Sequence, residues 1–469
     1  MPHSLAVEVH DFGPIGAAKL QLRPLTVLTG PNNAGKSYLS MLIYALSGAF
    51  GRAPARYRHP PFVFRRYARQ EQEPPLSKEA KKWVVEQRKS KQAHTIEELP
   101  GEIRQALSRA VTQAVRGVAD GLSEELARSF AAKIPNLARR EGPGCFCLRM
   151  EQSDPPLVLA FASEDDRLAV KDSKWSLEPL PVRADQLPRT AVEWGWVDFV
   201  GSVLVRLFPS LLTTSYYFPA ARSGILQGHK ALASFILSRA PLAGIQRFEI
   251  PTLSGVLADF LANLLNLEPR ATRVGVRDVA EFLEERACKG SVDLLLPQSR
   301  LEYPEIYYGV GDSMLPLHRT SSMVSEMAPI ILFLKYLVQR GDLLIIEEPE
   351  AHLHPDNQRI LAQAMVRLVR RGVGLLVTTH SDYLLHQLSN FILLATNEEQ
   401  RKKLGYAQDE YIRAREVGAY LVSFGTNGHG SGVTELHVTE EDGIPEEEFV
   451  KIQEALYNET TSIEYASRD

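Results

Sequence analysis

The chain has 469 residues, of which 44% are hydrophobic and 23% are charged. This length accommodates one large domain with insertions, or two to three smaller domains. The formal net charge is −4 and the isoelectric point is about 6.3, so no global positive field draws the protein onto nucleic acid. Any contact with nucleic acid must therefore come from a local basic patch.

Cysteine usage and hydropathy indicate the reducing interior of a cell. Cys145, Cys147 and Cys288 are too few and too irregularly spaced for a disulfide framework or a zinc cluster, and buried thiols are the simpler interpretation. The first residues lack the basic and long apolar regions of a signal peptide. No apolar run approaches the roughly 20 residues of a membrane span. We therefore expect a soluble, cytoplasmic protein without a membrane partner.

The chain begins with the pattern of a β-hairpin. Residues 5–10 alternate between apolar and polar side chains, as a half-buried strand does. A turn is expected over residues 11–16, and residues 19–22 return as the partner strand. Residues 25–29 then form the next strand of the prediction.

A phosphate-binding loop follows directly. The eight residues from Gly30 to Ser37 fit G-x-x-x-x-G-K-[ST] without a mismatch, and they lie between a strand and a helix predicted over 37–46. Gly30 and Gly35 allow backbone N–H groups to surround phosphate oxygens, and the helix N-terminus adds partial positive charge. Lys36 is expected to reach the β- and γ-phosphates, and the serine to ligate Mg²⁺. These residues predict a nucleotide-binding site.

The next segment mixes arginines with aromatic residues. They are Arg52, Arg56, Arg58, Arg65, Arg66 and Arg69, interleaved with Tyr57, His59, Phe62, Phe64 and Tyr67. Such a mixture suits a nucleic-acid path, because the charges follow the phosphates and the rings stack on bases. The alternative is a solvated excursion from the surface of the nucleotide-binding core.

The middle of the chain is predicted to be largely helical. Apolar residues recur at every third or fourth position through much of 78–139. Short strands are expected at 145–150, 157–162 and 168–170, and further helical segments at 192–212 and 228–288.

An apolar run, Leu343–Ile346, ends in two adjacent acids, Glu347 and Glu348. An unbroken apolar run is typical of a strand buried on both faces of a parallel sheet. Ligands bind at the carboxyl edge of such sheets, and two acids at that edge are explained if a cation binds there. The phosphate-binding loop and this strand are therefore expected to share one site.

Further elements are predicted around this strand. They are a strand at 313–317, helices at 327–339 and 356–370, a strand at 374–379 that ends at His380, a strand at 391–395, a hairpin from 420–424 and 433–438, and a helix at 446–457.

Lys36 and Glu347 lie 311 residues apart, yet both are expected to contact one nucleotide. A plain α/β nucleotide-binding core is shorter, so insertions must leave the sheet and rejoin it. We predict an α/β fold, a P-loop core with a mixed sheet flanked by helices and with large, mainly helical insertions. The expected divisions are a core part at 1–50, an insertion at 51–212, a return to the core at 213–225, a helical lobe at 226–300 and a second core part at 301–469.

Four stretches, in this order, resemble the ABC-type ATPases of the SMC, RecF and OLD group: Gly30–Ser37, Ser321–Glu326, Ile345–Pro355 and Thr378–Ser381. The run Glu-Glu-Pro-Glu-Ala-His-Leu-His-Pro is most similar to the OLD-like ATPases of bacterial anti-phage systems. The likeness covers about residues 1–50, 213–225 and 313–395.

The resemblance implies an ATPase that uses ATP and Mg²⁺. It assigns ATP contacts to the Walker A residues Gly30, Asn32, Asn33, Ala34, Gly35, Lys36 and Ser37. It places Glu347 in the Walker B position, where it holds Mg²⁺ together with Ser37. Glu348 is implied to be the general base that polarises the attacking water, and His380 the switch histidine that contacts the γ-phosphate.

The resemblance also implies a dimer. Ser322 matches the signature serine, which in this family reaches across a dimer to the partner's nucleotide. Met323 and Val324 stand where glycines are common, and close backbone approach to a phosphate is harder without glycine. Arg222 lies where the family's Q-loop region falls, and it is a candidate for a phosphate or interface contact.

A second cluster permits another interpretation. Glu350, His352 and His354 have a spacing that could suggest a metal site. However, this segment follows the Walker B strand directly, where the family has a loop that contacts the dimer partner.

The function implied by the resemblance is an ATP-driven switch that controls a separate effector, a nuclease or toxin, in anti-phage defence. No Toprim-like pairing of a glutamate with a later Asp-x-Asp is present, so the chain is not expected to cut nucleic acid. The alternative is a RecF- or SMC-like ATPase of DNA repair or chromosome maintenance, which would bind nucleic acid through Arg52–Arg69. A transporter ATPase fits less well, because the insertions are long and membrane-docking character is lacking.

Overall fold

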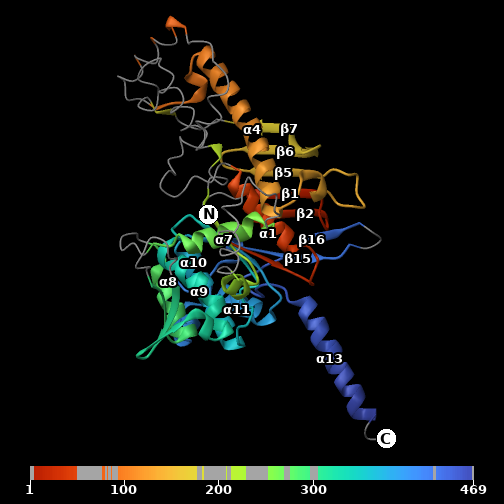
Figure 1. Ribbon diagram of the computed structural model, residues 1–469. Coiled ribbons are helices and arrows are strands. Elements are labelled where there is room, and N and C mark those ends of the chain that lie inside the picture. Colours follow the sequence, from red (N-terminus) through yellow and green to blue (C-terminus); the bar gives the residue numbers. More distant parts are fainter. Residues whose placement is uncertain are drawn as a thin grey trace, which may run out of the picture. The chain divides into compact units, whose positions relative to one another are not determined.

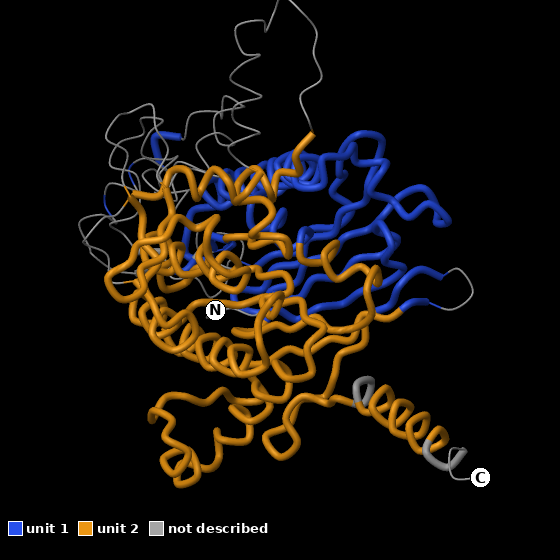
Figure 2. Tube along the Cα trace, turned by 60° about the horizontal axis from the view of Figure 1, so that its bottom comes forward, with its two compact units in different colours: residues 1–22, 41–215, 424–432 blue, residues 23–40, 216–423, 433–469 orange. Residues whose placement is uncertain are grey.

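The computed structural model describes residues 5–49, 77–79, 82, 86, 93–176, 182–183, 207–208, 213–228, 252–268, 275–295, 305–425 and 429–466. The chain forms two compact units from interleaved segments, shown in separate colours in Figure 2. Unit 1 comprises Met1–Leu22, Met41–Ser215 and Phe424–Gly432, and unit 2 comprises Arg23–Ser40, Tyr216–Ser423 and Val433–Asp469. The Arg/aromatic segment 52–69 and most of the predicted helix 192–212 lie outside the described residues.

Unit 1 is built on a mixed sheet. Its strands are β1 (Leu5–Phe12), β2 (Ile15–Leu22), β5 (Cys147–Gln152), β6 (Leu157–Glu164) and β7 (Arg167–Trp175). They lie in the order β7-β6-β5-β1-β2 with antiparallel neighbours, and the start of β16 (Ser431–Leu436) pairs in parallel with β2. The predicted hairpin is confirmed, with a turn shorter than expected because Phe12 already pairs with Ile15.

One long helix, α4 (Gly101–Phe130), accompanies this sheet. Its apolar residues recur at helical spacing, and the buried Ser123 hydroxyl accepts a hydrogen bond from the Leu168 amide of β7 at 2.8 Å. Phe12 packs edge-to-face on Phe130 of the helix and on Phe146. The short elements of this unit are β4 (Ala93–His94), η2 (Ile96–Glu98), η3 (Ile134–Leu137) and β8 (Val182–Arg183).

Unit 2 contains the parallel strands. They are β3 (Leu25–Thr29), β13 (Leu343–Glu347), β14 (Gly374–Thr378) and β15 (Val417–Ser423), with β9 (Ser215–Phe218) beside β13. The order is β15-β3-β14-β13-β9, and the pairs β15–β3, β3–β14 and β14–β13 are parallel. Every residue of β3, β13 and β14 is buried, as expected for strands covered on both faces.

Unit 2 also contains helices, several of which are labelled in Figure 1. They are α7 (Gly255–Leu265), α8 (Arg277–Leu283), α9 (Ser322–Tyr336), α10 (Pro355–Arg370), α11 (Asp382–Leu393) and α12 (Glu398–Lys403), while α1 (Lys36–Gly48) begins in unit 2. The aromatic rings of Phe218, Phe260 and Phe333 contact one another and join β9, α7 and α9. The remaining elements are the π-helical turn η6 (Glu284–Cys288), the antiparallel sheet of β10 (Ser291–Leu295), β11 (Glu305–Val310) and β12 (Ser313–Pro316), the turns η7 (Leu317–Arg319) and η8 (Ala414–Glu416), and α13 (Glu447–Ala466).

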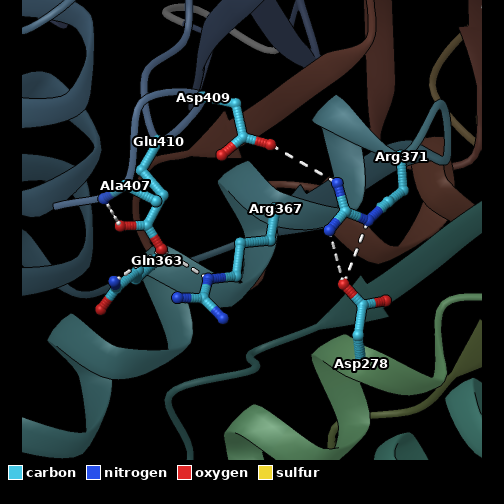
Figure 3. Close-up of polar contacts among 7 residues, drawn as sticks. All are labelled: Asp278, Gln363, Arg367, Arg371, Ala407, Asp409 and Glu410. Atoms are coloured by element: carbon cyan, nitrogen blue, oxygen red, sulfur yellow. Dashed lines mark hydrogen bonds and ion pairs between the residues drawn. The ribbon is translucent and has the colours of Figure 1, made fainter.

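A network of charges attaches α8 and the loop after α12 to α10, the helix that follows the acidic strand (Figure 3). Arg371 forms ion pairs with Asp278 of α8 and with Asp409. The buried Glu410 accepts hydrogen bonds from the side chains of Gln363 and Arg367 on α10. The helical lobe is therefore held to α10 by side-chain polar contacts.

Two sequence predictions are wrong in their details. The helix predicted over 327–339 begins at Ser322, because the Ser321 hydroxyl caps it by accepting from the Val324 amide at 3.3 Å. The strand predicted at 391–395 is instead the end of α11, since Leu384, Leu388 and Phe391 recur at helical spacing and are all buried.

The cysteines also differ from the expectation of buried thiols. Cys147 is exposed and Cys145 is partly exposed. Cys288 is buried, and burial raises the pKa of its thiol to about 12. Within the described parts of the chain, no helix combines the length and apolar character needed to cross a membrane.

Candidate functional site

The carboxyl ends of three parallel strands in unit 2 meet at one edge of the sheet. Glu347 at the end of β13 pairs with Thr378 of β14, which in turn pairs with Leu28 of β3. The Glu348 amide donates to the Thr378 carbonyl at 3.0 Å, and the Thr379 amide donates to the Leu28 carbonyl at 3.0 Å. The loops that follow these strands therefore leave the sheet side by side, which is where ligands bind in such sheets.

The loop after β3 needs glycine for its shape. Gly30 has φ +130°, and a Cβ placed there would lie 2.1 Å from the Val422 carbonyl oxygen of β15. Gly35 has φ +106°, and Asn33 adopts φ +62°. Asn32 and Asn33 are exposed, whereas Ala34 and Gly35 are buried against the core. The loop thus folds back sharply into the start of α1.

Lys36 points its amine into this loop. The residue is only 6% exposed, and Nζ donates to the carbonyl oxygens of Gly30 at 2.9 Å and Pro31 at 2.8 Å. Burial lowers the pKa of the amine, and the nearby carboxylates of Glu348, Glu350 and Glu347 oppose that shift. The structure therefore brings the lysine of the first loop and the acids of the second into one electrostatic cluster, as the sequence predicts.

The two adjacent acids are placed differently. Glu347 is buried, and its Oε1 has no hydrogen-bond partner among the described residues. The Glu348 side chain is 43% exposed, and its Oε1 lies 3.8 Å from Nε2 of His380. Glu348 has φ +41°, an unusual conformation for a residue with a side chain. One carboxylate thus faces the protein interior and the other faces outward beside the histidine.

Glu350 holds the loop after β14. It accepts hydrogen bonds from the Thr379 hydroxyl at 2.6 Å and from the His380 amide at 2.7 Å. Burial raises the pKa of its carboxyl group. His354 instead caps α10, with Nδ1 accepting from the Asp356 amide. Among the described residues, no group of three metal-ligating side chains gathers, so Glu350, His352 and His354 do not form a cluster.

The fold lowers the pKa of His380. Burial and the nearby Lys36 ammonium both lower its pKa from the ordinary value of 6.5, and Glu348 opposes them. The next residue, Ser381, caps α11 by accepting from the Leu384 amide. His380 therefore lies in the short connection between the end of β14 and the capped start of α11.

Arg222, which the sequence suggested for a phosphate or interface contact, is instead buried and has a role that sequence reasoning missed. Its side chain is 0% exposed, and its guanidinium donates to the carbonyl oxygens of Glu347 at 2.7 Å and Glu348 at 3.2 Å. Nε forms an ion pair with Glu326 of α9 at 3.0 Å. Arg222 thus stabilises the acidic loop, the loop after β13, through hydrogen bonds to its backbone carbonyl groups. A charged residue just after the apolar strand β9, and a glutamate within the apolar α9, were the available signals.

Glu326 extends this support. Its Oε1 accepts from the amide and hydroxyl of Ser223, at 3.2 and 2.6 Å. The Glu326 carboxylate thus connects α9 to the segment that carries Arg222. The same helix begins with Ser322, which is exposed, while Val324 is buried and Met323 packs against the core. The two residues that replace glycines therefore serve as core contacts.

Parts of the chain resemble known proteins. Residues 263–385 match the family model described as an AAA ATPase domain. The comparison with curated proteins gave no match. The matched residues include the acidic strand, β14 and His380.

The solved structures that match along most of the chain include SMC heads. The SMC head bound to the C-terminal winged-helix domain of ScpA has a TM-score of 0.42 and 11% identity, over 93% of this chain and 98% of that one. The Pyrococcus furiosus SMC head bound to the C-terminal domain of ScpA has a TM-score of 0.38 and 11% identity, over 96% and 98%. The SMC head from Thermotoga maritima has a TM-score of 0.33 and 10% identity, over 93% and 99%.

Proposed function

We propose that the edge formed by β3, β13 and β14 binds and hydrolyses ATP. One observation carries the proposal: strands far apart in sequence end together, so that Lys36 lies within electrostatic reach of Glu347 and Glu348. Phosphoryl transfer to water depends on positioning and charge neutralisation more than on covalent chemistry. A lysine in an amide-lined loop supplies the neutralisation.

The outward-facing carboxylate suits the role of general base. Glu348 is exposed enough to reach a water molecule, and Arg222 and Thr378 hold its backbone from both sides. His380, kept neutral by burial and Lys36, can donate a hydrogen bond to a phosphate oxygen. Glu348 would thus orient the attacking water while His380 reads the terminal phosphate.

The buried carboxylate fits a Mg²⁺ ion. Oε1 of Glu347 is a buried, unpaired oxygen within the described residues, and such an atom is costly unless something binds it. Carboxylate and hydroxyl oxygens are the ligands that Mg²⁺ prefers, so Glu347 and the exposed Ser37 are the residues that would hold it. The bound ion would neutralise charge on the β- and γ-phosphates.

We further propose that two copies enclose ATP between them and that this closure controls a separate effector. Ser322 supports the first part, because it is exposed at the start of α9 and the resemblance implies that it contacts a partner's nucleotide. The resemblance of the Glu347–Pro355 run to OLD-like ATPases supports a role in anti-phage defence, with a nuclease or toxin as the effector.

Light scattering on the variant Glu348→Gln tests the closure. This variant should retain ATP, so adding ATP with Mg²⁺ should raise the molecular mass from one copy to two or more. Adding Ser322→Arg to it should abolish the shift, whereas Gln408→Arg, at another exposed position of unit 2, should not. An unchanged mass with ATP would contradict the proposal.

The alternative, an ATPase that binds nucleic acid, depends on the Arg52–Arg69 segment, which lies outside the described residues. Replacing its arginines should then abolish DNA-stimulated hydrolysis and flatten its salt dependence. If DNA does not stimulate the wild-type rate at any salt concentration, the effector role is the better account.

A further inference from the structure

The helix α13 exposes several large apolar side chains, and three of them share one side. Ile452, Leu456 and Ile463 are 60%, 59% and 63% exposed. Residues separated by four and then seven positions lie on the same side of an α-helix, so these three form one narrow stripe. In both views α13 extends away from the other helices of unit 2 (Figures 1 and 2). Contiguous exposed apolar surface of this kind marks an interaction site.

An acidic residue interrupts the stripe. Glu459 lies three positions after Leu456 and four before Ile463, so it occupies a seam position of the same heptad pattern, and it is exposed. A polar residue at a seam position selects the partner, because it must meet a compatible group when the seam closes. The stripe is therefore suited to a partner that supplies a cation at this level.

A second copy of α13 does not meet that requirement. In a parallel pair, Glu459 would face the same carboxylate of the other copy, and in an antiparallel pair it would be buried against apolar side chains. Both arrangements are unfavourable. The helix sequence adds to this, because it contains five glutamates and a single lysine. Charge complementarity thus points to a different, basic partner.

The same helix is tied to the nucleotide site. The Gln453 side chain donates to Asp382 at 3.4 Å, and His386 lies 3.4 Å from Glu446, just before α13. Asp382 and His386 belong to α11, which begins two residues after His380. A protein bound to α13 would therefore occupy a helix that is hydrogen-bonded to α11, whose first residue follows His380 by two positions.

We propose that the Ile452–Leu456–Ile463 stripe docks an amphipathic helix of another protein, which carries a lysine or arginine opposite Glu459. This inference rests on the proposed control of an effector, and it gives that effector a chemistry. Apolar residues at heptad positions supply the affinity, and the charge pair supplies the choice of partner.

Fluorescence anisotropy on the full chain tests the proposal with two labelled, designed helical peptides of about 21 residues. Both carry leucine at the seam positions and differ only at the one facing Glu459, where one has lysine and the other glutamate. The wild-type chain should bind the lysine peptide at least about tenfold more tightly. Glu459→Lys should reverse this preference, and Leu456→Asp should abolish binding of both peptides.

Matched measurements separate the other outcomes. Asn458→Asp, on the opposite side of α13, should leave both affinities unchanged, and every α13 variant should hydrolyse ATP at the wild-type rate, which reports correct folding. Equal binding of the two peptides, or no reversal in Glu459→Lys, would overturn the proposal. So would a nucleotide-free dimer in sedimentation velocity that Leu456→Asp dissolves, because the occupant would then be a second copy. ATP-dependent association of Glu348→Gln is measured without peptide. Failure of the proposed closure around ATP and failure of the proposed docking on α13 are therefore seen in separate experiments.

Discussion

The two loops that meet at the sheet edge obtain their shapes in opposite ways. The loop after β3 turns on glycines, with Gly30 at φ +130° and Gly35 at φ +106°. The loop after β13 turns on residues with side chains, with Glu348 at φ +41° and His352 at φ +61°. The first conformation is available to glycine at little cost, whereas the second costs about 1–3 kcal/mol per residue unless the surroundings impose it.

The surroundings of the second loop do impose it. Arg222 donates to the carbonyl oxygens of Glu347 and Glu348, and the Glu348 amide donates to Thr378. A loop made by glycine is encoded locally and can be recognised as a motif. A loop made by distant donors places the Glu348 carboxylate where a relaxed backbone would not, and it depends on the segment around Arg222 and on α9.

The largest expected effect concerns the exposed acid of the second loop. Glu348→Gln keeps the side-chain shape but cannot accept a proton, so the rate of ATP hydrolysis should fall by about 10²–10⁴-fold. ATP binding should persist, since the first loop is unchanged. Measurements of phosphate release and of equilibrium ATP binding check this prediction. Glu347→Gln is the comparison variant, because its loss of hydrolysis should depend on the Mg²⁺ concentration.

Removing Arg222, which donates hydrogen bonds to the second loop, should lower the stability of the fold as well as the hydrolysis rate. Arg222→Met leaves Glu326 buried without its cation, and such a change destabilises by about 3–5 kcal/mol. Urea unfolding measures this loss. The double variant Arg222→Met/Glu326→Met should recover much of the stability but little of the hydrolysis rate, because the carbonyl oxygens of the acidic loop still lack donors. Full recovery of the rate would show that Arg222 only stabilises the fold.

A side chain at Gly30 should disrupt the first loop by a steric clash. Gly30→Ala places a methyl group 2.1 Å from the Val422 carbonyl oxygen at a positive φ, and we expect ATP binding to weaken at least about tenfold. Gly405→Ala is the matched control, because Gly405 also has a positive φ of +78° but has open space around it. The control should lose only about 1–2 kcal/mol of stability from backbone strain and should bind ATP normally.

The smallest effect is a pH dependence at the histidine between the loops. The pKa of His380 lies below 6.5, so the folded protein binds fewer protons than the unfolded chain as the pH falls below that value. The contribution of His380 to stability should therefore be fully present above its ordinary pKa of 6.5 and should be lost as the pH falls below that value, and hydrolysis should decline over the same range. His380→Gln should remove this contribution to the acid decline. An identical pH profile in that variant would assign the decline to another group.

The sequence alone determined the features that depend on local chemistry. The glycines of Gly30–Ser37 predicted the sharp turn after β3, and the apolar runs of β3, β13 and β14 predicted the buried parallel strands, because backbone freedom and continuous burial leave direct traces in residue type. The 311-residue separation of Lys36 and Glu347 predicted that insertions leave the sheet and rejoin it.

Tertiary structure alone decided which way the two acids face and what supports them. Arg222 reaches the acidic loop from 125 residues away, and nothing near it in sequence specifies that contact. The apolar residues of 391–395 suit a strand or a helix equally, and only their position at the end of α11 resolves the choice. Such features arise from contacts between distant segments, and a single sequence records the residues of those contacts without recording their pairing.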